Sequence, residues 1–184
     1  VITDTLDSQL DLDTFEFTEA AFGNHVITVP DGLIYYETRI DLRPEGIDAV
    51  VDVTLALDQE TRQLRAEFMA RDPDTGWLPD DALVGLLPPN DETGCGEGWI
   101  SYLVMPVAGL PSGSVIPNQG RIVFDYNDPI DTPEVVNTID AGTPTSNVAA
   151  LPPALSTPSF TVTWSGQDEP GGSGIAGYDI FVST

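Results

Sequence analysis

The chain has 184 residues, of which 41% are hydrophobic, and these values favour one or two packed domains over a disordered chain. Thirty acidic residues stand against six basic ones, all arginine, so the formal net charge is −24. This charge argues against nucleic acid and against an anionic membrane surface as partners, because both would be repelled. No run of about 18 apolar residues is present, so we expect no membrane insertion. Cations are the natural partners, and the alternative is a solvated surface adapted to salt.

Short segments of alternating apolar and polar residues follow one another along the chain and predict strands. No stretch keeps apolar residues at helical spacing over three turns, and 16 prolines and 17 glycines are spread between the segments. We therefore predict an all-β fold, an antiparallel sandwich, with a hairpin turn at 58–62. The predicted strands are residues 1–6, 14–18, 25–29, 33–42, 49–57, 63–69, 98–107, 120–125 and 134–139.

Two segments break this pattern. Residues 71–97 are rich in Pro, Gly and Asp, and a loop of this length is usually functional or ordered by something else. We expect Trp77, within it, to pack onto the sandwich, with stacking on a sugar ring as the alternative. Residues 141–157 are small, Pro-rich and nearly uncharged, which is typical of a domain junction. An edge strand of the next domain is expected near 147–151.

The last segment, 158–184, contains one predicted strand with Trp164, a Gly-rich loop and a second predicted strand with Tyr178. This order resembles the opening of a fibronectin type III-like sandwich, of which only part is present. The resemblance implies that Trp164 and Tyr178 lie in a core. We expect the open edge of such a partial sandwich to be paired by strand addition, from a neighbouring module of the same polypeptide or from another copy.

Two groups of oxygen-bearing side chains are candidates for calcium, which takes six to eight oxygen ligands. One group follows the strand predicted at 120–125. The other lies in 71–97 and resembles the start of an EF-hand loop, although the glutamate required at its twelfth position is missing. In the alternative interpretation, the residues of both groups only form turns. Asp168 and Glu169, in the last segment of the chain, belong to neither group and are expected to be solvated turn residues. The candidate ligands are Asp125, Asn127, Asp128 and Asp131 in the first group, and Asp72, Asp74, Asp80 and Asp81 in the second.

The residues that catalysis would need are scarce. His25 is the only histidine and Cys95 the only cysteine, so a Ser-His-Asp triad or a zinc site has almost nothing to draw on. No nucleophile-elbow pattern accompanies any serine. Because lysine is absent, an internal Lys–Asn cross-link, as found in some surface adhesins, cannot form. We therefore expect that the chain is not an enzyme.

Several sequence stretches resemble a known family when they are taken in order. They are VITDTLDSQLDLDTFEF, DQETRQL, DPDTGWLPDDALVGLLPPND, GEGWISYLVMPVAGLPSGSVIPNQGRIVFDYNDPIDTPEVVNTID and FTVTWSGQDEPGGSGIAGYDIFVS. Together they resemble an Ig-like β-sandwich repeat module of large bacterial secreted and surface proteins, followed by the start of a fibronectin type III-like domain. The resemblance implies an Ig-like module at 1–141 without its first strands, a junction at 142–157 and a partial domain at 158–184. It implies no catalytic residue.

This resemblance leads to two hypotheses of function. The first is a structural or adhesive spacer module of a large extracellular or cell-surface bacterial protein, stabilised by calcium. The alternative is a carbohydrate-binding accessory module of a secreted enzyme, in which Trp77 and the 71–97 loop contact a glycan.

Overall fold

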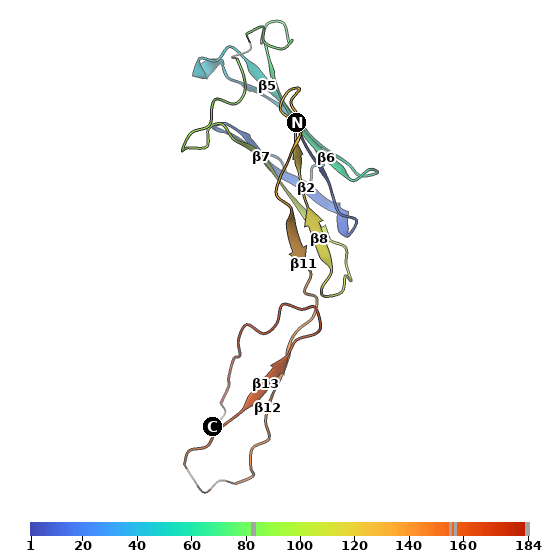
Figure 1. Ribbon diagram of the computed structural model, residues 1–184, viewed down its shortest axis with the longest axis vertical. Coiled ribbons are helices and arrows are strands. Elements are labelled where there is room, and N and C mark those ends of the chain that lie inside the picture. The colour runs from blue at the N-terminus through green and yellow to red at the C-terminus, as the bar shows by residue number, and fades with distance from the viewer. Residues whose placement is uncertain (82–83, 155, 157, 183–184) are drawn as a thin grey trace. The chain divides into compact units, whose positions relative to one another are not determined.

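A computed structural model describes residues 1–81, 84–154, 156 and 158–182, and these residues form two compact units. The first unit comprises Val1–Val107 and Pro117–Val135, and the second Ala108–Ile116 and Val136–Thr184. Thirteen strands and one short 3₁₀ helix, η1 (Arg43–Glu45), make up the regular structure of the described chain (Figure 1). The prediction of an all-β, antiparallel fold is therefore confirmed. None of the described residues lies in a helix long and apolar enough to cross a membrane.

Two antiparallel sheets form the first unit (Figure 1). The six-stranded sheet has the order β10-β9-β1-β6-β5-β4, and the three-stranded sheet has the order β3-β2-β7. The strands of the larger sheet are β1 (Ile2–Thr5), β4 (Tyr35–Asp41), β5 (Val50–Asp58), β6 (Gln63–Arg71), β9 (Arg121–Ile122) and β10 (Ile130–Asp131). Those of the smaller sheet are β2 (Leu10–Phe22), β3 (His25–Thr28) and β7 (Gly98–Pro106).

The alternation in the sequence decides which side chains fill the space between the two sheets. On β5, Val51, Val53 and Leu55 are fully buried, whereas the residues between them are half-exposed. On β2, Phe15 and Phe17 point the same way and meet edge to face, with ring centroids 4.9 Å apart. These side chains belong to one core cluster drawn from both sheets, so the unit is a sandwich with a single core.

The outer face of the large sheet carries paired charges. Asp52 on β5 accepts hydrogen bonds from Arg39 on β4, at 2.6 and 3.1 Å, and from Arg71 on β6, at 2.6 Å. Arg121 on β9 forms a two-fold contact with Asp131, its register partner on β10, at 2.6 and 3.1 Å. Arginine is scarce in the sequence, and these three arginines connect neighbouring strands on the outer face of the large sheet.

The strand prediction succeeds where the alternation is long and fails where pairing partners decide. The hairpin at 58–62 is confirmed, because β5 and β6 pair antiparallel with Asp58 opposite Gln63. The strand predicted at 120–125 is reduced to the two residues of β9, since the chain turns away at Asp125, whose φ is +50°. The pair β8 (Val115–Asn118) and β11 (Val135–Thr138) forms a separate two-stranded sheet, of which only β11 was predicted.

The second unit contains the pair β12 (Thr145–Val148) and β13 (Trp164–Gln167), which join antiparallel. β12 lies close to the edge strand expected near 147–151. The second strand predicted around Tyr178 is wrong, because the backbone there makes no strand pairing. Trp164 and Tyr178 meet edge to face at 6.3 Å but remain 46% and 43% exposed. The expectation that both lie in a core is therefore also wrong for this unit as described.

Candidate metal site

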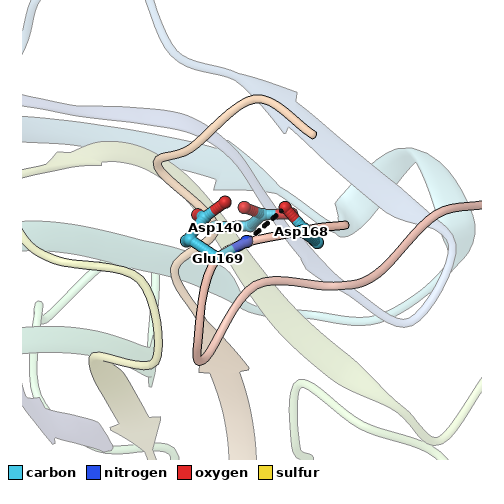
Figure 2. Close-up of side chains that lie close together, drawn as sticks. All are labelled: Asp140, Asp168 and Glu169. Carbon is cyan, nitrogen blue, oxygen red and sulfur yellow. Dashed lines mark hydrogen bonds between the residues drawn. The ribbon is translucent and has the colours of Figure 1, made fainter. Parts of the chain in front are cut away.

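Three carboxylates of the second unit converge at one place, which we call the acidic cluster: Asp140, Asp168 and Glu169. Each offers an oxygen, and these oxygens all lie within 4.8 Å of one another (Figure 2). Asp140 lies just beyond β11, and the other two follow directly on β13. The acids that follow β11 and β13, two strands far apart in the sequence, therefore lie close together.

Hydrogen bonds from the 173–174 turn fix the two aspartates. Asp140 Oδ2 accepts from the backbone N–H of Ser173 at 3.0 Å and from its hydroxyl at 2.6 Å. Asp168 Oδ2 accepts from the N–H of Gly174 at 2.7 Å, and Oδ1 accepts from the N–H of Glu169 at 3.0 Å, as Figure 2 shows. Because one turn holds both aspartates, their positions depend on each other.

Glu169 is only half satisfied. Its Oε1 accepts a hydrogen bond from the hydroxyl of Ser112, which itself accepts from the N–H of Ala141 at 2.8 Å. Its Oε2 is buried and has no hydrogen-bond partner among the described residues. A buried acceptor without a donor costs about 1–3 kcal/mol, and more when it is charged. The carboxylate therefore has an open bonding capacity inside the unit.

Two glycines allow the backbone to approach the cluster. A Cβ added at Gly142 would lie 2.0–2.1 Å from the carboxyl atoms of Glu169, and one at Gly172 would lie 2.6 Å from Asp168 Oδ2. Real Cβ atoms do not come so close to other heavy atoms. Both positions consequently need glycine if the carboxylates are to stay where they are.

The unit has no cationic side chain to balance these charges. Every arginine and the single histidine lie outside 108–116 and 136–184, and the chain contains no lysine. Converging carboxylate oxygens without imidazole or thiolate suit a hard cation such as calcium better than zinc. Three carboxylates can supply part of the six to eight oxygens, with backbone carbonyls and water supplying the rest. Asp140, Asp168 and Glu169 are thus the residues that could hold a metal here.

The first predicted calcium group lies in the hairpin between β9 and β10. Asp125 is exposed with a left-handed backbone, and the N–H of Asn127 bonds to the carbonyl of Phe124 at 2.9 Å, as in an ordinary turn. Asp128 is exposed, and Asp131 is occupied by Arg121, whose guanidinium lowers the pKa of that carboxyl. No set of three acidic side chains from this group converges within the described chain.

The second predicted group is also arranged as turns. Asp72 Oδ1 accepts from the N–H groups of Asp74 and Thr75 at 3.0 and 2.7 Å, and these bonds lower its pKa. Asp80 and Asp81 are exposed further along the loop. The described residues show no converging set of three acids here either. Calcium at both predicted groups stays a prediction, and the turn-forming alternative accounts for the contacts that are seen.

The acidic cluster was not predicted from the sequence. Asp168 and Glu169 were expected to be solvated turn residues, whereas both are half-buried, and Asp140 was not among the candidate ligands. One signal was available, because no basic residue follows Arg121 in the chain. The absence of basic residues indicated that acids after Arg121 would have no cationic side chain nearby in the sequence. It did not indicate which of these acids lie close together.

The residues weighed for catalysis have structural contacts. His25 Nε2 lies 3.0 Å from Glu45 Oε1, and the ring packs against Phe22 at 5.0 Å. Cys95 is half-exposed and its thiol lies 3.6 Å from the carbonyl oxygen of Pro89. Neither contact joins a nucleophile to a base. That the chain is not an enzyme stays a prediction.

Comparison with known proteins gives one match. Residues 84–138 match the model of a family described as a domain of unknown function (DUF7619). No curated protein and no solved structure gives a significant match. The matched stretch includes β7 to β11 and covers less than half of the chain. The match shows that this stretch is similar to that domain, and it names no activity.

Proposed function

We propose that this chain is a structural spacer module of a large extracellular bacterial protein, and that the second unit is stiffened by calcium at the acidic cluster. The calcium part of the proposal rests on the convergence of three carboxylates in a unit with no basic side chain. The spacer role rests on the resemblance of the sequence to modules of large bacterial secreted and surface proteins. Glu169 Oε2, which is buried without a hydrogen-bond partner among the described residues, adds to this observation, because a bound cation would supply a partner.

The stiffening follows from which segments a cation would join. Ser112, Asp140 and the Asp168–Glu169 pair come from three stretches of the second unit. Among the described residues between 145 and 167, the four-residue strands β12 and β13 pair, and one more backbone hydrogen bond, from Ala149 to Thr163, extends the pairing. Backbone hydrogen bonds also join Gly113 and Ser114 to Ile139, at 2.8 Å each. A cation bound to the acids would add a side-chain connection where these three stretches meet. A module so stabilised would display other domains at a fixed spacing.

Calcium binding can be measured directly on the purified chain. We expect isothermal titration to give binding that is lost in Asp168→Asn/Glu169→Gln, and chelator to lower the melting temperature of the wild type by several degrees. Asp179→Asn is the matched control, since Asp179 is an exposed acid of the same unit outside the acidic cluster. Equal binding by all three proteins, or no binding at all, would remove calcium from the proposal.

The proposal also includes a neighbour that covers the second unit. Large apolar side chains of this unit are exposed, among them Phe181 at 91% and Ile180 at 61%. Such surface favours a neighbouring module or another copy that pairs by strand addition. Light scattering over a range of concentrations tests the second case, since a chain that pairs with itself grows in mass on concentration.

A carbohydrate-binding module remains the second candidate, because of one side chain. Trp77 does not pack onto the sandwich as expected but is 77% exposed, and an open indole can stack on a sugar ring. A glycan array compares wild type with Trp77→Ala and, as control, Leu78→Ala, whose side chain is 57% exposed. Glycan binding lost only in Trp77→Ala would favour this candidate, and an array without hits would exclude it.

A further inference from the structure

Strand β7 is a long, uncharged edge of the first unit. It pairs with β2 on one side, and no described strand pairs with its other side. Proteins usually protect such edges by making them short or charged, because the free backbone groups can pair with another chain. The other edges of this unit follow that rule: β10 has two residues, β3 has four, and β4 carries Glu37, Arg39 and Asp41. β7 has nine residues and no charged side chain.

Odd-numbered positions of β7 direct their backbone groups toward β2. The N–H of Met105 donates to the hydroxyl of Thr14, on β2, at 2.8 Å. Just before β7, the carbonyl of Glu97 accepts from the N–H of Gly23, at the end of β2, at 2.9 Å. Because backbone direction alternates along a strand, the even-numbered positions direct their backbone groups to the free edge.

The partner of Tyr102 on β2 confirms this direction. Phe17 lies opposite Tyr102, and its N–H bonds to the carbonyl of Leu33 at 3.0 Å, on the side of β2 that faces away from β7. Residues directly opposite each other in an antiparallel pair either both point inward or both point outward. The N–H and C=O groups of Ile100, Tyr102 and Val104 therefore point to the free edge, while their side chains pack against the core.

The outer face of β7 is apolar as well. Alternation places the side chains of Trp99, Ser101, Leu103 and Met105 on this face. The side chains of Trp99, Leu103 and Met105 are 41%, 59% and 62% exposed. β7 thus combines free backbone groups with exposed apolar surface, the two features that strand addition uses.

The strand is complementary to itself. If two copies of β7 pair antiparallel with Tyr102 at the two-fold axis, Ile100 lies opposite Val104 of the second copy, and the even-numbered positions exchange about six main-chain hydrogen bonds. On the outer face, Trp99 then lies opposite Met105 of the second copy, and this contact occurs twice. A thioether against an indole is a favourable contact. An isologous pair of this kind closes without leaving a further edge of β7.

Charge favours a second copy over a foreign partner at this edge. With a net charge of −24, the chain attracts basic partners to its acidic surfaces, whereas residues 98–120 carry no charge. The nearest acids are Glu16 and Glu19 on β2, opposite Leu103 and Ser101. In the pair they lie three strand spacings from those of the second copy, about 14 Å. This exceeds the screening length of about 8 Å at physiological salt, so the acids repel only weakly.

We propose that β7 is a self-association edge: two copies of the chain pair antiparallel through β7, centred on Tyr102, and join their three-stranded sheets into one continuous sheet. This interface is separate from the acidic cluster and from the exposed surface of the second unit. Since the rest of the two chains repel each other, salt strengthens the association.

Sedimentation equilibrium over a range of concentrations tests the pairing, with reductant present to keep Cys95 free. We expect the mass of the wild type to rise toward twice that of the monomer, and to do so at lower concentration when salt is added. A chain that stays monomeric up to about 1 mM, a concentration that detects even weak pairs, would overturn the proposal.

A charge on the outer face separates β7 from other surfaces. In Leu103→Glu the two new carboxylates are diagonal neighbours across the pair, so we expect the dissociation constant to rise by about tenfold or more. Val26→Glu is the matched control, because Val26 lies on β3, at the other edge of the same sheet, is 62% exposed and receives the same charge. Association as tight in Leu103→Glu as in the wild type would overturn the proposal and leave the second unit as the interface.

Hydrogen exchange gives a measurement on the wild type alone. The amides of Ile100, Tyr102 and Val104 should become protected as concentration rises, whereas the amide of Met105, already bonded to Thr14, should change little. Growth in mass without protection of the three even-numbered amides contradicts pairing through β7.

Discussion

Substitution of Gly142 by alanine tests the acidic cluster through a single added atom. The φ of Gly142 is not in the left-handed region, so alanine is compatible with the backbone there. At such a position alanine normally stabilises a protein by about 0.4–1 kcal/mol, because it restricts the unfolded chain. Any other outcome must therefore come from contacts of the new methyl group.

The contacts of the new methyl group predict that Gly142→Ala destabilises the unit instead. The added Cβ would lie 2.0 Å from Glu169 Cδ, so the carboxylate must move away. That movement breaks the hydrogen bond from Ser112. A hydrogen bond to a charged group contributes about 1.5–3 kcal/mol. After the gain from the unfolded chain is subtracted, we expect Gly142→Ala to destabilise the second unit by about 1–2 kcal/mol.

Gly177→Ala is the matched control in the same unit. Its φ is also outside the left-handed region and no heavy atom lies within 4 Å of the added Cβ, so we expect stabilisation by about 0.4–1 kcal/mol. Hydrogen exchange of the β12 and β13 amides measures the local free energy of opening for both variants. If Gly142→Ala protects these amides as well as Gly177→Ala does, Glu169 does not lie where the structure places it.

Three further predictions concern the sandwich of the first unit. Phe17→Ala should lower the free energy of unfolding by about 3–5 kcal/mol in urea, because Phe17 is fully buried against Phe15, and a loss below about 1 kcal/mol would contradict its place in the core. Asp52→Asn should cost about 1 kcal/mol, less at high salt, since it weakens the contacts to Arg39 and Arg71. The contacts to Arg39 and Arg71 lower the pKa of Asp52, so their contribution to the free energy of unfolding is present above pH 3.8 and is lost as pH falls through the pKa of the folded protein. Urea unfolding of wild type and variant at several pH values measures this loss. Tyr102 should ionise near pH 12, because burial and the Asp4 charge raise its pKa to about 12; an ultraviolet titration in which Tyr102→Phe removes no late-ionising tyrosine would refute this.

Local pattern was sufficient for the sheets of the first unit. The valines and leucine of β5 and the phenylalanines of β2 alternate with polar residues over a long run, and the side-chain period of a strand converts that order directly into a buried and an exposed face. The turn between β5 and β6 has local signals as well. The short strands β8 and β10 were missed, because their few residues lack the apolar–polar alternation that reveals β3 and β11, and their formation depends on a partner strand.

The second unit shows where local pattern misleads. The resemblance to a fibronectin type III-like opening implied that Trp164 and Tyr178 lie in a core. A core needs covering strands, and beside these side chains the described part of the unit has the pair β12–β13. Trp77 likewise remains exposed although tryptophan is usually buried. Burial is a property of the surroundings of a side chain, so its residue type gives only a tendency.

The sequence by itself determined the all-β class, the strong negative charge and the lack of any basic residue after Arg121. Only the tertiary structure decided which acids meet: it joins Ser112 to Glu169 across 57 positions of the chain and brings Asp140 beside both. It likewise placed Asp4 against Tyr102, 98 positions away. Composition and spacing act locally along the chain, whereas a shared site depends on strand pairing and turns that bring distant residues together.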